Sequence, residues 1–381
     1  MKKLFVKLLA VCVSISCLMK SNLSVHAVDE LKQEKFFDYD SFYTQVIESD
    51  EWKKTYNRAI RGEMLQLPDE LLSSLDTETL VEAVLDYPFF RDIYAFDDVQ
   101  YGVDQFFESF NGAQELSHRI DAATCLLDKY INTEVLSSSD MKKMNSIEIG
   151  DSVYALSNIE VMLAQEFVVS NLDTADIAEL DNIVARKNME KKQNSEYGTT
   201  TDIFYKISKP KYDEFSQENT LRSYPTYYVY TPNNTAVAVI SRGEELSESQ
   251  INSNHNYVST YYPSAIRYGS STTKYNCHSY AWYLQSTSNC YWMNYPNAYW
   301  NDGSYSNYST PTVNSKMVWR TDNTVTHSAV VVDLLSGPVY PPYGYTDLVN
   351  VKSKWGELGL YKHNGLASPY WVNNTYTTFY R

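Results

Sequence analysis

One cysteine in the second half of the chain stands where a nucleophile would be useful. Cys277 lies in the run YNCHSYAWY, whose residues after the cysteine favour a helix. At a helix start, unpaired N–H groups and partial positive charge favour thiolate over thiol and lower the thiol pKa from about 8.5. The same N–H groups can hold the oxyanion of an acyl transition state. The sequence therefore predicts Cys277 as a nucleophile.

A base for this thiol is available at His327, which begins the apolar run HSAVVV. A helix-start cysteine that faces a strand-start histidine forms a workable catalytic pair. A third polar group on the next strand would orient the imidazole. That predicted strand, VNVKSKWG, offers Ser353 and Asn350, which would lie on opposite faces of a regular strand. The third catalytic residue is left open between these two.

The order of these motifs resembles the papain-like fold of the NlpC/P60 and CHAP cysteine hydrolases. It is most similar to secreted bacterial members marked by N-C-x-[SA]-x-A, a later His before an apolar strand, S-K-[LW]-G and a downstream His. The matching residues here are Asn276 to Ala281, His327, Ser353 to Gly356 and His363. The resemblance covers roughly residues 260–381. It implies hydrolysis of an amide bond in peptidoglycan peptides through a Cys277/His327 acyl-enzyme.

Five further residues are assigned to the cleft or the oxyanion site. An upstream tyrosine donates to the oxyanion in similar enzymes, which makes Tyr275 a candidate donor. Asn276, Trp355 and His363 are expected to line the cleft. His278 departs from the usual family pattern and is expected to pack or line the cleft rather than catalyse. No C-x-x-C or H-E-x-x-H motif is present, so neither a metal nor a cofactor is expected.

Charge and tyrosine content divide the chain into two parts. Residues 28–200 hold 15 Lys and Arg against 35 Asp and Glu, whereas residues 201–381 hold 13 against 12. Tyrosine occurs 9 times up to residue 200 and 25 times after it. The first part shows apolar stripes at helical spacing, preceded by capping residues such as Asp76 and the pair Asp97-Asp98. The second part shows β-branched and aromatic runs at 226–230, 236–240 and 375–380.

These patterns predict an α+β protein. We expect an acidic, all-helical domain over residues 28–185 and a polar linker over 186–201. A papain-like α+β domain with an antiparallel sheet would follow over 202–381, with its core at 260–381. The acidic domain is a candidate for docking on a basic partner, and the formal net charge of −15 argues against nucleic-acid binding.

The first 27 residues have the features of a secretory signal peptide. A basic start precedes an apolar run and the small residues of a cleavage site at Val25-His26-Ala27. The protein is therefore expected to be secreted or associated with the cell surface, with no membrane span after cleavage. Outside the cell, cysteines can pair. The mature chain keeps Cys125, Cys277 and Cys290, an odd number that leaves a Cys125–Cys290 bond open.

Two alternative functions are compatible with the same residues. Papain-like sites also run transglutamination and deamidation, in which an amine or water receives the acyl group. A third possibility is a catalytically inactive module that binds a cell-surface glycan or peptide. The aromatic and amide-rich run 291–308 suits a glycan surface, or else a well-packed loop over the cleft.

Overall fold

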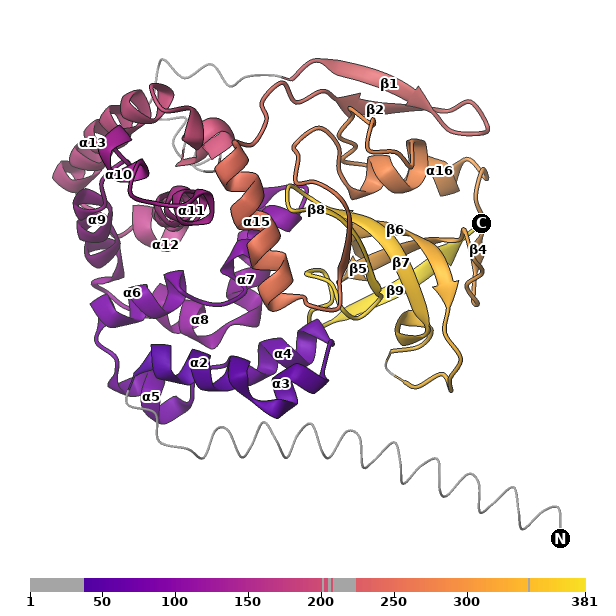
Figure 1. The fold of residues 1–381 in the computed structure, drawn as a ribbon, viewed down its shortest axis with the longest axis horizontal. Helices are drawn as coiled ribbons and strands as arrows, with labels where there is room; N and C mark the ends of the chain where they lie inside the picture. Colours follow the sequence, from indigo (N-terminus) through magenta and orange to yellow (C-terminus); the bar gives the residue numbers. More distant parts are fainter. Residues whose placement is uncertain (1–37, 201, 205–206, 208–223, 342) are drawn as a thin grey trace, which may run out of the picture.

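A computed structural model describes residues 38–200, 202–204, 207, 224–341 and 343–381. A helical half, built from residues up to 204, lies beside a sheet-containing half built from residue 224 onward (Figure 1). The mixed helix and antiparallel sheet confirm the α+β class. Residues 1–27, assigned to the signal peptide, lie outside the described residues.

Capping side chains set many of the helix starts in the first half. Asp76, Asp98, Asn145 and Asp173 each accept a hydrogen bond from a first-turn amide. The helical segments of this half are α2 (Tyr39–Glu48), α3 (Asp50–Lys54), α4 (Arg58–Met64), α5 (Asp69–Ser74), α6 (Thr77–Leu85), η1 (Phe90–Ala95), α7 (Val99–Ser109), α8 (Asn111–His118), α9 (Ala122–Asn132), α10 (Ser138–Met141), α11 (Ser146–Leu163), α12 (Glu166–Val169), α13 (Thr174–Lys192) and η2 (Ser195–Thr200). Among the helices of the described residues, none combines the length and apolar character needed to cross a bilayer.

Within the described residues, the second half contains one antiparallel sheet of seven strands, in the order β3-β8-β7-β6-β5-β9-β4, and a separate hairpin β1-β2. The strands are β1 (Thr226–Tyr230), β2 (Ala236–Ile240), β3 (Ile266–Gly269), β4 (Asn307–Tyr308), β5 (Lys316–Thr321), β6 (Thr324–Leu334), β7 (Val349–Trp355), β8 (Gly359–Asn364) and β9 (Thr375–Tyr380). The remaining helical segments are α15 (Glu248–Tyr261), the wide turn η3 (Ser279–Tyr283), α16 (Ala298–Asn301) and η4 (Thr346–Leu348).

The two faces of the sheet are buried against different partners. On β6, Ala329 and Val331 belong to a hydrophobic core that also contains the helices of the first half. Val330, on the other face, joins a second core formed with hairpin β1-β2, η3 and α16. The helical half therefore covers the central part of one face of the sheet, and the two halves share a core.

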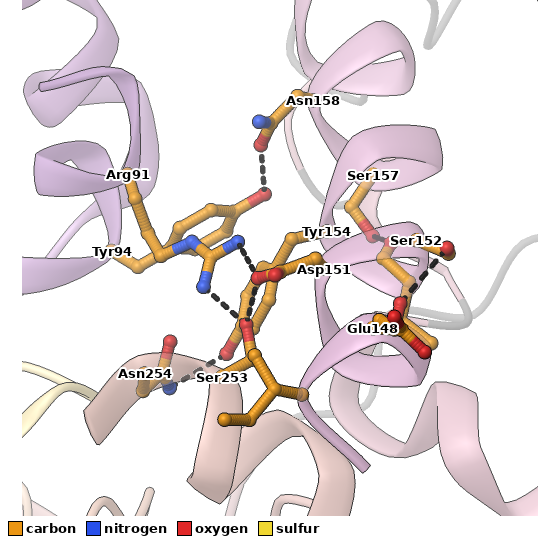
Figure 2. Close-up of polar contacts among 12 residues, drawn as sticks. Arg91, Tyr94, Glu148, Asp151, Ser152, Tyr154, Ser157, Asn158, Ser253 and Asn254 are labelled. Atoms are coloured by element: carbon orange, nitrogen blue, oxygen red, sulfur yellow. Dashed lines mark hydrogen bonds and ion pairs between the residues drawn. The ribbon is translucent and has the colours of Figure 1, made fainter. Parts of the chain in front are cut away.

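Helix α15 strengthens this union, because it follows the boundary in sequence yet packs on α11 (Figure 1). Arg91 of η1 pairs with Asp151 of α11 at 3.1 Å and donates to the Ser253 hydroxyl of α15 (Figure 2). Asn254 of α15 donates to the Tyr154 hydroxyl at 2.8 Å. This polar seam fixes the orientation of the helical half on the sheet.

The segment 186–201, predicted to be a linker, does not have the exposed form of one. Helix α13 continues to Lys192 and η2 follows. Lys191 is fully buried and pairs with the buried Glu160, and Tyr197 is also fully buried. The linker was predicted from polar composition alone. A lysine can nevertheless be buried when its aliphatic stem packs and a carboxylate elsewhere in the chain pairs with its charge.

Candidate active site at Cys277

Cys277 begins a helix, as predicted, but the helix is a single wide turn that ends at Tyr283. Asn276 sets its position. The Asn276 side-chain oxygen accepts from the amides of Ser279 and Met293, both at 3.0 Å, and its nitrogen donates to the Met293 carbonyl at 2.7 Å. Asn276 therefore holds the turn in place and is not free to line a cleft.

The turn carrying Cys277 packs against both β6 and β7. Pairing between these strands ends at Val330 and Lys352, on the side of the site. The amide groups of Ser328 and His278 lie at the sulfur and act to lower the Cys277 pKa. Burial, and then the charge of Asp97, outweigh them and raise this pKa well above its usual value. The lowered pKa expected from the sequence is thus corrected: the helix is short and the sulfur is buried beside a carboxylate.

Asp97 is the site residue that sequence reasoning missed. Its two carboxylate oxygens lie 3.9 and 4.0 Å from Cys277 Sγ, although the residues are 180 positions apart. Asp98, not Asp97, caps helix α7 by accepting from the Gln100 amide. A helix cap needs only one residue of the acidic pair. The second residue was therefore the available sign that Asp97 has another role. Burial raises the pKa of Asp97 to about 7.

His278 lies at the centre of the site rather than at its edge. Its Nε2 is 3.1 Å from Asp97 Oδ2, and its Nδ1 is 2.8 Å from the Ser328 hydroxyl. Trp282 Nε1 donates to the same hydroxyl at 2.9 Å. Burial lowers the pKa of His278 to about 3, so the ring is neutral. Asp97, Cys277 and His278 thus form one compact cluster.

His327 lies inside β6, as its fourth residue, and not at the start itself. Its ring stacks on Tyr370 with centroids 3.6 Å apart and contacts Trp319 edge-on. Neither ring nitrogen has a hydrogen-bond partner among the described residues. Burial, reinforced by His363 and His278, keeps the His327 pKa well below its usual value. The ring is therefore neutral, and its lowered pKa makes it a weaker proton acceptor than an exposed imidazole.

The two candidates for the third catalytic residue lie apart. The Ser353 hydroxyl is 2.7 Å from Nε2 of His363, and Trp355 Nε1 lies 3.1 Å from both atoms. Nδ1 of His363 donates to the Asn364 carbonyl at 2.8 Å, so Ser353 donates to Nε2. Asn350 lies on the other face of β7 and donates to Asp333 at 3.4 Å. Neither residue hydrogen-bonds His327.

Tyr275 and Lys354 fix the loop before the cysteine. Tyr275 is buried in the second core, beside Tyr280. Lys354 of β7 lies over the Tyr275 ring and donates to the carbonyls of Thr272, at 2.9 Å, and Gly356. Burial lowers the pKa of Lys354 to about 7. Lys354 was not predicted, and it ties this loop to the end of β7.

The end of η1 covers the site from the helical half. The Tyr370 hydroxyl donates to the Ala95 carbonyl, and the Glu357 amide donates to the Tyr94 carbonyl at 3.0 Å. Gly356 has a positive φ of 42°, and a Cβ there would overlap the carbonyls of Tyr94 and Ala95. The site is therefore assembled from both halves of the chain.

The remaining thiols and the aromatic run supply no member of the Asp97, Cys277 and His278 cluster. Cys125 and Cys290 are both free, so the disulfide left open by the sequence is not formed in this structure. Trp292 and Tyr299 are buried. Tyr295 and Tyr308 of the same run are exposed, so both the packed-loop and the surface interpretation stay predictions.

Comparisons with models of known families, with curated proteins and with solved structures find no match. The function is therefore argued from the geometry of the site.

Proposed function

We propose that the protein is a cysteine hydrolase of papain-like fold that cleaves an amide bond through a thioester on Cys277. The observation that carries this proposal is the position of the sulfur. It lies at the backbone of Ser328, the residue directly after His327. His327 is a buried, neutral imidazole with both nitrogens unpartnered among the described residues. This position supports the proposal, because a nucleophile and a base of the right types then belong to neighbouring backbone segments.

The reaction would proceed in two steps. His327 takes the thiol proton, Cys277 attacks the amide carbonyl, and the leaving amine takes the proton from His327. Water then attacks the thioester, which releases the acid and restores the thiol. Burial, and then the Asp97 carboxylate, favour the protonated thiol, so we expect substrate binding to displace this carboxylate before the first step.

The substrate class rests on the motif resemblance. Peptide stems or cross-bridges of peptidoglycan contain amide bonds that lie outside the cell membrane. A secreted or surface-associated enzyme meets them directly, in agreement with the signal peptide predicted at residues 1–27. The reaction as written needs no cofactor.

The test is an incubation of the full mature chain with purified peptidoglycan, followed by mass spectrometry of the soluble fragments. We expect fragments with new amine and carboxyl ends. Cys277→Ala should abolish them, and Cys290→Ser, which changes an exposed thiol that the proposed reaction does not use, should leave them unchanged. Fragments that persist in Cys277→Ala contradict the proposal. Products that carry an added primary amine instead of water would identify acyl transfer.

The burial of Cys277 favours a second candidate, a module that binds cell-wall peptide or glycan without catalysis. A raised thiol pKa is what a structural cysteine shows. In that case wild type and Cys277→Ala would co-sediment equally with peptidoglycan, and neither would release fragments.

A further inference from the structure

We propose that Asp97, Cys277 and His278 form a binding site for Zn²⁺. This inference goes beyond the proposed hydrolase and does not require Cys277 to act as a nucleophile. One ligand atom from each residue lies within 4.8 Å of the other two. Asp97 comes from the helical half and the other two residues from the sheet half, so a bound ion would bridge the halves.

Two of the three separations between ligand atoms are close to those around a tetrahedral ion, and the third, between Cys277 and His278, lies within 4.8 Å. Zn²⁺ binds S, N and O ligands at about 2.0–2.3 Å, which places tetrahedral ligands roughly 3.4–3.6 Å apart. Asp97 lies 3.9–4.0 Å from the sulfur and 3.1 Å from His278 Nε2. Shifts of about half an ångström bring these separations to the ideal values, which is within the reach of side-chain rotation.

Groups around the cluster hold His278 in the orientation that a metal ligand needs. Ser328 contacts Nδ1 at 2.8 Å, which leaves Nε2 directed at Asp97. When Nε2 binds a metal, Nδ1 carries the proton and donates to Ser328, while Trp282 continues to donate to the same oxygen. Metal-bound histidines usually make such a second hydrogen bond, because it fixes the tautomer and the ring.

The cluster is buried but can be reached. Cys277 and His278 are 1% and 2% exposed, whereas the Asp97 side chain keeps 18% of its exposure. Asp97 is therefore the member of the cluster through which we expect an ion to enter. Two cationic side chains near the cluster already have partners, so their charges do not oppose a bound metal strongly. Arg242 pairs with Glu357 at 3.0 Å, and Lys354 donates to backbone carbonyls.

The ligand types select the ion. A thiolate is a soft ligand that Mg²⁺ and Ca²⁺ do not favour, and the set of one thiolate, one imidazole and one carboxylate suits Zn²⁺. Binding replaces the thiol proton, so that Zn²⁺ and the protonated thiol give the zinc thiolate and one proton released to solvent. The two ligand charges of Asp97 and Cys277 then balance the charge of the ion.

The test uses the full mature chain with Cys125→Ser and Cys290→Ser, so that Cys277 is the remaining thiol. Zn²⁺ affinity is measured by competition with a chromophoric chelator, and Co²⁺ is added separately as a spectroscopic probe. We expect one equivalent of Zn²⁺ per chain and a thiolate-to-cobalt charge-transfer band. Asp97→Asn and His278→Gln should each weaken Zn²⁺ binding at least tenfold, and Ser328→Ala about 10- to 100-fold.

Asp98→Asn is the matched control. It makes the same chemical change one residue away, and asparagine caps a helix as well as aspartate does. Its Zn²⁺ affinity should equal that of the parent, and circular dichroism should show that every variant is folded. Absence of stoichiometric binding, or equal affinity in parent, Asp97→Asn and His278→Gln, overturns the proposal.

The two proposals fail separately. Zn²⁺ binding without any release of peptidoglycan fragments would remove the hydrolase and keep the metal site. Fragment release by a chain that does not bind Zn²⁺ would support the hydrolase and contradict the metal site. If both hold, Zn²⁺ should suppress fragment release by the parent, because the ion occupies the nucleophile.

Discussion

At the scale of single residues, Cys277 keeps its proton first because the sulfur is buried and second because it lies beside Asp97. The carboxylate lies within 4.0 Å of the sulfur in a buried setting, so a negative charge on Asp97 opposes a negative charge on the thiol. The amides of His278 and Ser328 act in the opposite direction but do not prevail. Without substrate, Cys277 is therefore a thiol rather than a thiolate.

Removing the carboxylate charge should make Cys277 more reactive. In the chain that keeps only this thiol, with a chelator present, we expect Asp97→Asn to lower the Cys277 pKa by about one unit. Iodoacetamide should then react about three- to fourfold faster above pH 7, where Asp97 of the parent is ionised, because the thiolate fraction rises more than its nucleophilicity falls. The rate is followed by mass spectrometry over a range of pH.

Asp98→Asn should alkylate at the parent rate, because Asp98 only caps α7. An unchanged or slower rate in Asp97→Asn would mean that burial alone sets the thiol pKa.

The sequence revealed one side of this cluster and not the other. Cys277 and His278 are adjacent, and their chemistry can be seen in the motif. Asp97 is brought to them only by the packing of η1 and α7 on the sheet, which no local pattern encodes. The general rule that an acidic pair before a helix caps it explained Asp98 and hid Asp97.

At the scale of elements, the buried His363 of β8, which contacts Ser353 of β7, makes the stability of the protein depend on pH. His363 is neutral in the fold because burial lowers its pKa to about 4, whereas an unfolded histidine titrates near 6.5. The unfolded chain therefore binds more protons than the fold between these values. The stability that depends on neutral His363 is fully present above pH 6.5 and is lost as the pH falls towards 4.

His363→Gln should reduce this dependence on pH. Between pH 7 and pH 5, wild type should lose about 2 kcal/mol more unfolding free energy than the variant, since protonation of one histidine in the unfolded chain is then absent. Urea titrations at the two pH values measure the difference. Each protein is compared with itself at the two pH values. A loss of unfolding free energy that comes from removing the Ser353 contact is the same at both and therefore cancels. Equal losses in both proteins would contradict the buried, neutral state.

The contact between α11 and α15 makes a second prediction at this scale. Gly150 of α11 faces α15 so closely that a Cβ would overlap the Ser249 carbonyl oxygen. Alanine normally stabilises a helix relative to glycine by about 1 kcal/mol. Here we expect Gly150→Ala to destabilise the protein by about 1–3 kcal/mol, because the helices must move apart. Thermal and urea unfolding measure the change.

Gly243→Ala serves as the control, since nothing lies within 4 Å of a Cβ at that position. It should change stability by less than about 1 kcal/mol. A stabilising Gly150→Ala would show that the two helices are not in close contact.

Element prediction worked best where local pattern decides. Strands β1, β2 and β9 have the predicted bounds, because alternation and turn residues define them. His327 was placed at a strand start because the hairpin turn before it was missed. Asp322 and Asn323 both adopt positive φ and reverse the chain between β5 and β6, so β6 begins earlier.

At the scale of the whole molecule, the helical half shares a hydrophobic core with the sheet. One face of the sheet, including Trp319, Val351 and Trp355, belongs to the same core as Phe42 and Leu126 of the helical half. The sequence suggested two domains because charge and tyrosine content change near residue 200. Composition reports the surface and the secondary structure, and it carries no information about a core shared by the two parts.

The shared core predicts that the second half does not fold alone. A fragment of residues 202–381 would expose a face of large apolar side chains to water, and each buried Trp or Val contributes about 1.5–3 kcal/mol only while it is covered. We expect this fragment to bind a hydrophobic dye and to unfold without a cooperative transition, whereas the chain from residue 28 unfolds cooperatively. Adding residues 28–200 in trans should restore the transition, because they supply the missing surface. A fragment that melts sharply and binds no dye would show that the sheet half has a sufficient core of its own, and that the helical half is a cover which can leave the Cys277 site.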